Sequence, residues 1–378
     1  VRSVDARRTN LPYAASRFVG RQWDLHDLHG LLARGARLVT VVGPAGSGKT
    51  RLTQELGWRS VDAVTAAGGG VWIAELAEAH TLEQVVDVLA LSLGVPLALA
   101  ATADEELVQV GRALATRGPA LVLLDNAEQV MDPLRQVLRH LRQAAPDVRV
   151  VVTSRTAMGL EGEAVHRLGP LGADAAVALF ADRARAIRRD FELGEAERRA
   201  AVRIARRLEH NPLALELAAV RVKVLPPATL ADRLDQRFDV LGRGPRDSDD
   251  RHSTLRRAID WSWELLEPGQ QQALAALPVF RGGFSLAGAE AVLASDAPTQ
   301  LVAALVERSL IQRYEPVSDP GTVRLRLYES VREYAAAHRT DPAIPARHAA
   351  WVASHRALPL TELANAHAAF DHAAQSDP

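Results

Sequence analysis

The chain has 378 residues, of which 48% are hydrophobic and 4% aromatic, with a formal net charge of −1 at pH 7 and no cysteine. This composition excludes disulfides and thiolate metal sites, and it excludes a global field that would draw the chain to nucleic acid or to an anionic membrane. No apolar run reaches the roughly 18 residues that cross a bilayer. We expect a cytoplasmic protein of two to four domains.

The first part of the chain predicts alternating strands and helices. A polar, irregular lead-in over residues 1–20 precedes a helix whose apolar face includes Trp23, Leu25 and Leu28. The elements that follow are expected at 38–42 (strand), 49–58 (helix), 71–76 (strand), 81–93 and 103–116 (helices), 120–124 (strand), 127–143 (helix) and 148–153 (strand). Such alternation implies right-handed βαβ crossovers and a parallel sheet, with nucleotide at the carboxyl ends of the strands.

A complete phosphate-binding loop of the form GxxxxGK[ST] lies between the first strand and the next helix. Its glycines let backbone N–H groups curl around a β-phosphate, Lys49 reaches the β/γ-phosphates, and the Thr50 hydroxyl completes a Mg²⁺ shell. The loop predicts that the chain binds a nucleoside triphosphate or diphosphate. The residues expected at the nucleotide are Gly43, Pro44, Ala45, Gly46, Ser47, Gly48, Lys49, Thr50 and Arg51.

Two later strands end in residues that suit phosphate chemistry. Asp125 follows the apolar run 120–124, where a Mg²⁺-coordinating Walker B acid must lie, although a strand-end aspartate also caps turns. The next residue is Asn126, where hydrolysing relatives often carry a second acid, and Glu128 is the alternative. Arg155 ends the next strand and would contact a γ-phosphate, or pair with a nearby acid. Nucleotide binding is therefore predicted, with slow ATP hydrolysis at most.

The rest of the chain predicts helices and one short ribbon. The pattern is wholly helical from Asp174 to about Leu241, and the charge-dense stretch 242–251 reads as a linker. Helices follow near 254–266, 269–277, 285–293 and 298–309, then strands at 310–314 and 322–327, a winged-helix pattern. The resulting domains are a P-loop domain (1–170), a helical lid (171–245), a winged helix (246–342) and the start of a helical, TPR-like sensor (343–378).

Several motifs in this order resemble the STAND signal-transduction ATPases, and more narrowly their NB-ARC/AP-ATPase branch in large bacterial regulators. Besides the phosphate loop, they are Phe18-Val19-Gly20-Arg21, Leu124-Asp125-Asn126-Ala127-Glu128, Thr153-Ser154-Arg155, Asn211-Pro212-Leu213-Ala214, the stretch 254–263, Val279-Phe280-Arg281-Gly282-Gly283-Phe284 and the stretch 328–335. The resemblance covers about residues 9–340. It implies an α/β P-loop NTPase with a parallel sheet, followed by an all-helical lid and a winged-helix domain.

The resemblance also implies roles for individual residues. Val19, Gly20 and Arg21 would line the adenine and ribose, and Pro212 would pack on the adenine from the lid, although proline also suits a first helical position. Tyr328 falls where the family carries a histidine that contacts the ADP β-phosphate. A tyrosine offers one neutral hydrogen bond and no charge, so a weaker ADP latch is expected.

The implied function is an ATP/ADP switch that uses Mg²⁺. ADP would hold the domains closed, and ATP would open them for self-association and release a covalently linked effector outside residues 1–378, in response to an unidentified activating ligand. Two alternatives stay open: a constitutive ATPase motor, and a DNA-binding regulator that uses the winged helix. The expected recognition helix, Thr299 to Ser309, offers only Arg308 as a base reader, so nucleic acid is the less favoured partner. No membrane partner is expected.

Overall fold

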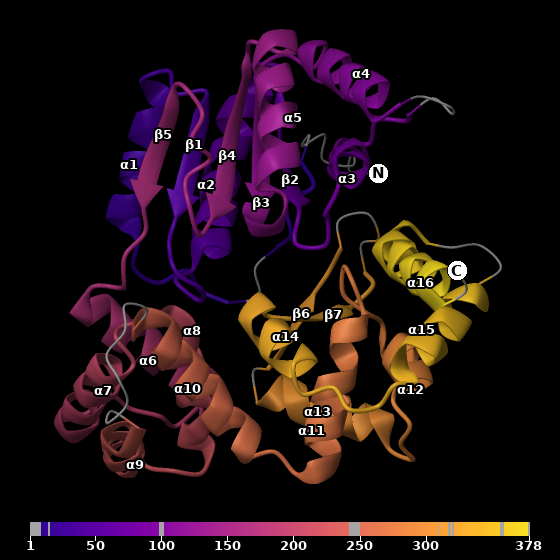
Figure 1. Ribbon diagram of the computed structural model, residues 1–378. Helices are drawn as coiled ribbons and strands as arrows, with labels where there is room; N and C mark the ends of the chain where they lie inside the picture. The colour runs from indigo at the N-terminus through magenta and orange to yellow at the C-terminus, as the bar shows by residue number, and fades with distance from the viewer. Residues whose placement is uncertain are drawn as a thin grey trace, which may run out of the picture. The chain divides into compact units, whose positions relative to one another are not determined.

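The computed structural model describes residues 9–13, 16–97, 102–241, 250–308, 310–316, 319, 321–355 and 359–376. The chain divides into two compact units (Figure 1). The sheet unit comprises Val1–Pro12, Arg21–Pro44 and Gly48–Gly169, and the helical unit comprises Tyr13–Gly20, Ala45–Ser47 and Pro170–Pro378. Residues 1–8, 14 and 15 of the lead-in lie outside the described residues.

The sheet unit is built on five parallel strands in the order β2-β3-β4-β1-β5. A β-branched apolar run forms β1 and a leucine-rich run forms β3; both strands are buried along their whole length, as expected for strands covered on both faces. The order places β4 between β3 and β1, so the carboxyl ends of these three strands are neighbours. The strands are β1 Leu38–Val42, β2 Gly70–Glu75, β3 Ala120–Asp125, β4 Val148–Ser154 and β5 Glu163–Arg167.

The helices of the sheet unit confirm the predicted α/β alternation with one interruption. They are α1 Gln22–Ala33, α2 Lys49–Ala66, α3 Leu82–Leu93, α4 Ala103–Ala115 and α5 Met131–Ala144. The helix predicted at 127–143 is present, but its predicted start is wrong: a 3-10 turn, η1 (Ala127–Gln129), comes first and α5 begins at Met131. A helix begun at residue 127 would place Pro133 in its interior, whereas α5 holds it in the first turn.

The fifth strand, β5, has no counterpart among the predicted elements. Its sequence, Glu163-Ala164-Val165-His166-Arg167, contains no apolar run, and each of its residues is at least partly exposed. It pairs with β1 at the edge of the sheet. An edge strand with little buried side chain lacks the hydrophobic pattern from which a strand is predicted.

The helical unit continues with helices and a two-stranded antiparallel ribbon. The helices are α6 Ala173–Ile187, α7 Glu195–Arg207, α8 Pro212–Ala219, the 3-10 turn η2 Val220–Lys223, α9 Pro227–Leu241 and α10 Asp250–Glu264. They are followed by α11 Pro268–Ala276, η3 Leu277–Val279, α12 Leu286–Val292, α13 Pro298–Glu307, strands β6 Ile311–Tyr314 and β7 Arg324–Leu327, and α14 Glu329–Ala336. These are the elements expected for a lid and a winged helix.

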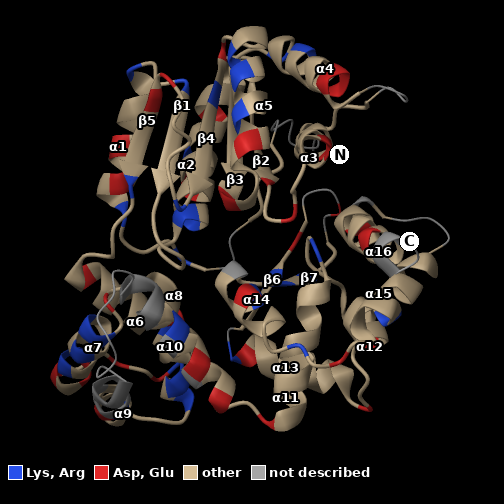
Figure 2. Ribbon diagram, viewed as in Figure 1, with Lys and Arg blue, Asp and Glu red and all other residues tan. Residues whose placement is uncertain are grey.

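The predicted linker at 242–251 is described only at its end. Residues 242–249 lie outside the described residues, whereas residues 250 and 251 form the first turn of α10. Both signs of charge are interspersed along α7 (Figure 2), where Arg199 pairs with Glu195, and Arg203 pairs with Asp232. None of the helices in the described ranges combines the length and apolarity that crossing a bilayer requires.

The C-terminal helices pack on the ribbon through a buried polar network. These elements are α15 Ile344–Ala353, the 3-10 turn η4 Leu360–Glu362 and α16 Leu363–Ser376. Arg324 of β7 forms an ion pair with Glu362, with side-chain exposures of 3% and 4%. Asn365 is fully buried, donates to Gly283 O at 3.0 Å and accepts from Arg281 N at 2.7 Å. Removing one partner of such an ion pair would leave a buried unpaired charge, so η4 and the start of α16 are tied to β7 at this point.

Candidate nucleotide-binding site

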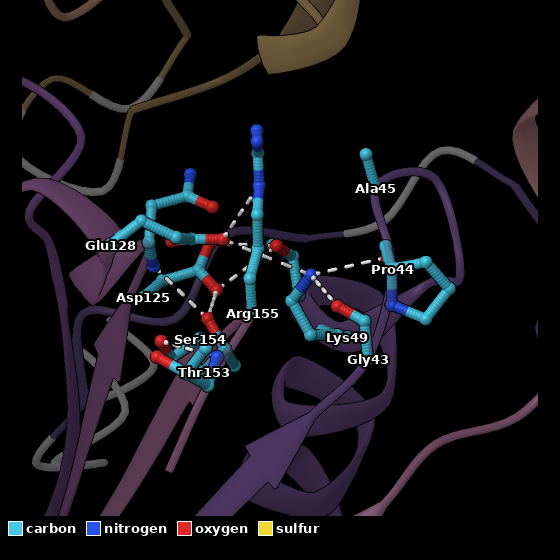
Figure 3. Close-up of polar contacts among 12 residues, drawn as sticks. Gly43, Pro44, Ala45, Lys49, Asp125, Glu128, Thr153, Ser154 and Arg155 are labelled. Atoms are coloured by element: carbon cyan, nitrogen blue, oxygen red, sulfur yellow. Dashed lines mark hydrogen bonds and ion pairs between the residues drawn. The ribbon is translucent and has the colours of Figure 1, made fainter. Parts of the chain in front are cut away.

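The phosphate loop leaves β1 at Gly43 and enters α2 at Lys49. Gly46 and Gly48 have φ angles of 72° and 91°, a left-handed conformation that side chains rarely adopt. The Lys49 side chain is folded back on the loop, and its Nζ donates to Gly43 O at 2.9 Å and to Pro44 O at 3.3 Å (Figure 3). The loop therefore has the glycine-dependent curl that a phosphate cradle needs, with a nearly buried ammonium group at its base.

Asp125 lies beside the loop at the end of β3. Its two carboxylate oxygens are 2.9 and 2.8 Å from Thr50 Oγ1, so the two residues expected at the metal are in direct contact. Complete burial raises the pKa of the Asp125 carboxyl to about 6, although a hydrogen bond from Thr153 opposes this rise. A buried carboxyl group whose pKa is raised by desolvation is typical of a functional site.

Thr153 is a contact residue that the sequence did not single out by itself. Its hydroxyl donates to Asp125 Oδ1 at 2.5 Å and accepts from Asn126 N at 3.0 Å. Thr153 is buried at the end of β4, which is the strand next to β3. The sequence indicated only that Thr153 is a hydroxyl residue at the end of a strand, close to Arg155. The strand order is what shows that Thr153 reaches Asp125.

Glu128 lies between two cations of the site (Figure 3). Its Oε1 is 3.9 Å from Lys49 Nζ and 3.6 Å from Arg155 Nε. Its Oε2 is buried and accepts no hydrogen bond from the described residues. The left-handed Asn126, with φ 58°, and the η1 turn bring Glu128 back over the strand end. The structure thus assembles Asp125, Glu128 and Arg155 around Lys49.

The donor set suits Mg²⁺ bound together with phosphates. A threonine hydroxyl and a carboxylate are hard oxygen ligands, and Mg²⁺ in nucleotide sites takes its remaining ligands from phosphate and water. Within the described ranges, no three His, Cys, Asp or Glu side chains converge on a point where they could hold a metal by themselves. Thr50 and Asp125 therefore fit a metal that arrives with a nucleotide.

The three residues expected at the adenine and ribose belong to different units. Val19 packs against the core of the helical unit, and Gly20 lies so close to Ala175 that an added Cβ would be 2.8 Å from Ala175 Cβ. Arg21 belongs to the sheet unit, where its Nη2 donates to Gly169 O at 2.8 Å and its Nη1 lies 3.5 Å from Asp24. Their contact with a base stays a prediction.

Pro212 and Tyr328 both lie in the helical unit. Pro212 is the first residue of α8, and Asn211 caps this helix by accepting from Ala214 N. The Tyr328 hydroxyl lies 3.2 Å from Glu216 Oε2 of α8, and burial raises the pKa of this phenol. Tyr328 thus contacts a lid carboxylate, and its predicted contact with a β-phosphate is not tested. Arg51, in the first turn of α2, lies 3.7 Å from Glu55 through its Nη1.

Comparisons with known proteins agree with this geometry. The family profile of the AAA ATPase domain matches residues 17–153. The uncharacterized protein Rv0894 of Mycobacterium tuberculosis is 33% identical over 325 residues, which cover 84% of this chain and 80% of that protein. A second protein of the same organism, named "Putative HTH-type transcriptional regulator Rv0890c", is 34% identical over 316 residues, which cover 82% of this chain and 34% of that protein.

Among solved structures, the STAND protein with a tetratricopeptide repeat sensor from Pyrococcus horikoshii is similar, with a TM-score of 0.60 and 15% identity. The match covers 98% of this chain and 50% of that protein, so this chain spans about half the length of that protein and about a third of the second mycobacterial relative. At this identity the likeness concerns the fold. The chain belongs to the same family as Rv0894; it contains a P-loop domain that matches the AAA ATPase profile, and its fold is similar to that of a STAND protein.

Proposed function

We propose that the chain is the nucleotide-operated switch of a larger bacterial signalling regulator. In the ADP state the P-loop domain, the helical lid and the winged helix are closed, and in the ATP state they open and allow self-association. The effector that this switch controls lies outside residues 1–378, and the activating ligand acts through the helical region that begins near residue 343. The domain limits of 1–170, 171–245, 246–342 and 343–378 belong to this proposal.

The position of Glu128 is the observation that favours a switch over a constitutive ATPase motor. Fast hydrolysis needs a carboxylate free to orient or deprotonate water, and residue 126, next to Asp125, is an asparagine. Glu128 is the carboxylate that remains, and its Oε1 lies between Lys49 and Arg155. A carboxylate oxygen held between two cations is not free to orient an attacking water, so water activation is poor. Binding is thus better supported than turnover.

The residues that would hold the nucleotide are those of the loop and its neighbours. Backbone N–H groups of the loop and the N-terminus of α2 would bind the phosphates, and Thr50 and Asp125 would hold Mg²⁺. The metal, when bound, neutralises phosphate charge. We propose that Arg155 distinguishes ATP from ADP, and its partly exposed side chain, with Nε 3.6 Å from Glu128 Oε1, supports this role. An added γ-phosphate would compete for that guanidinium.

The direct test is to purify the chain, denature it and identify released nucleotide by chromatography, with Lys49→Ala as the matched variant. We expect stoichiometric ADP from the wild type and none from Lys49→Ala, together with slow hydrolysis of added ATP. An empty wild type that hydrolyses ATP rapidly would refute the switch and support the constitutive ATPase motor. No binding of either nucleotide would refute both.

The name of one relative favours a second candidate, a regulator that binds DNA through its winged helix. Against it, α13 contains no lysine or arginine, and the flanking Arg308 donates to Leu265 O at 3.1 Å. Arginine and lysine make the commonest specific base contacts and also bind phosphates, so we place DNA contact outside α13. Salt-dependent binding of duplex DNA by residues 1–378, lost when Arg308 is replaced by alanine, would reverse this assignment.

A further inference from the structure

The tip of the phosphate loop is attached to the helical unit. Ala45–Ser47 cluster with that unit, whereas the loop residues on either side of them belong to the sheet unit. Asn211 Nδ2 donates to Ala45 O at 3.1 Å, and Leu213 N donates to Gly46 O at 3.3 Å. Both donors lie at the start of α8, beside Pro212. The tip of the loop expected to hold phosphate therefore contacts the start of α8 within the helical unit.

Close packing reinforces these two hydrogen bonds. An added Cβ on Gly46 would lie 2.8 Å from Asn211 Oδ1, 3.0 Å from Leu213 Cβ and 3.0 Å from Leu255 Cδ2. Residue 46 is one of the variable positions of the loop motif, so phosphate binding alone does not require glycine there. Its φ of 72° and its contact with α8 and α10 both favour a residue without a side chain.

The two hydrogen bonds also set the direction of the loop amides. In a planar trans peptide, the carbonyl oxygen and the following N–H point in opposite directions. With Ala45 O directed to Asn211 and Gly46 O directed to Leu213, the N–H groups of Gly46 and Ser47 point away from α8. Amides that are fixed in this way before the ligand arrives bind an anion without a further ordering cost.

Asn211 is suited to this task by its two functional groups. Its Oδ1 caps α8 by accepting from Ala214 N at 3.1 Å, and its Nδ2 reaches the loop. The residue is 9% exposed. A serine at this position would preserve the cap but has no donor that reaches Ala45 O, and an aspartate would preserve the cap while it places an acceptor against the carbonyl.

We propose that Asn211 is a positioning residue that joins the tip of the phosphate loop to the lid, so that nucleotide binding and the state of α8 change together. This inference rests on the proposed nucleotide binding. It adds a mechanical link: a shift at the start of α8 pulls residues 45–47 out of the phosphate-binding conformation. Conversely, an ordered loop holds α8 in place.

The test compares the wild type with Asn211→Ser, Asn211→Asp and the control Ser285→Ala, which removes the N-cap of α12 in the same unit. Dissociation of a fluorescent ADP analogue is followed by stopped flow. Amide hydrogen exchange of residues 213–219 in α8 is measured with and without ADP. We expect dissociation about 2- to 10-fold faster in Asn211→Ser, faster still in Asn211→Asp, and unchanged in the control. ADP should slow exchange in α8 of the wild type and the control, and not in the Asn211 variants.

A purely structural role for Asn211 would predict a different result. It would leave the protection of α8 by ADP intact in Asn211→Ser, because the helix cap is retained. If the wild type binds ADP and Asn211→Ser matches it in both measurements, the positioning role is overturned while the proposed function stands. If the wild type itself binds no ADP, the proposed function fails and the inference falls with it.

Discussion

Replacing Tyr328 by phenylalanine tests whether the lid contact of this residue keeps the closed state. The hydroxyl donates to Glu216 Oε2 at 3.2 Å, and Glu216 retains a second partner because Arg183 Nε donates to its other oxygen at 2.9 Å. The hydrogen bond lost in Tyr328→Phe has an ionised acceptor, which increases its contribution to stability. The bond is long, however, and Glu216 keeps its bond to Arg183, which reduces the cost of losing it. We therefore expect a cost of about 1–2 kcal/mol, which corresponds to a factor of roughly 5–30 in an equilibrium constant.

If this contact exists in the closed state alone, the ratio of closed to open molecules falls by that factor. ADP held by the closed state should then dissociate about 5- to 30-fold faster from Tyr328→Phe. The matched control is Tyr314→Phe, whose hydroxyl donates to Gly282 O at 2.9 Å. That variant loses a comparable bond within the ribbon region and should keep the wild-type dissociation rate. Equal rates in all three proteins, or equal acceleration in both variants, would refute the reasoning.

Three further predictions concern stability, measured by urea unfolding. Glu362→Ala should lower the free energy of unfolding by about 3–5 kcal/mol, because Arg324 becomes a buried unpaired charge. The control Asp371→Ala removes the more exposed ion pair with Arg281 and should lower it by about 1 kcal/mol or less. A similar loss in both variants would contradict this reasoning. Thr153→Val should cost about 1–3 kcal/mol and Thr153→Ser much less, since valine leaves Asn126 N–H without its acceptor and leaves Asp125 with Thr50 as its hydroxyl partner; equal losses would show that the hydroxyl is unimportant. Burial lowers the pKa of His348 to about 4, so the unfolded chain binds the proton first as pH falls. The free energy of unfolding of the wild type should therefore fall by about 2 kcal/mol more between pH 7 and pH 5 than that of His348→Gln. Parallel pH profiles of the two proteins would exclude this.

Local sequence patterns determined the phosphate loop and most of the sheet unit. The run before Gly43 is apolar and β-branched, the loop motif has fixed positions with fixed tasks, and Asp125 ends a run that is buried on both faces. Each of these signals lies within about ten consecutive residues, so it does not depend on the rest of the fold. The strands 38–42, 120–124 and 148–153 and the α/β class followed directly from them.

The tertiary structure alone decided which of these residues meet. Strand order brings Thr153 to Asp125, and the left-handed Asn126 turns Glu128 toward both Lys49 and Arg155, although residues 49 and 155 are far apart in the chain. In the same way, packing of α8 joins Asn211 to Ala45, a contact that no local motif indicates. A sequence specifies its local conformations through neighbouring residues, but distant side chains come together through burial and strand pairing, which depend on the whole fold.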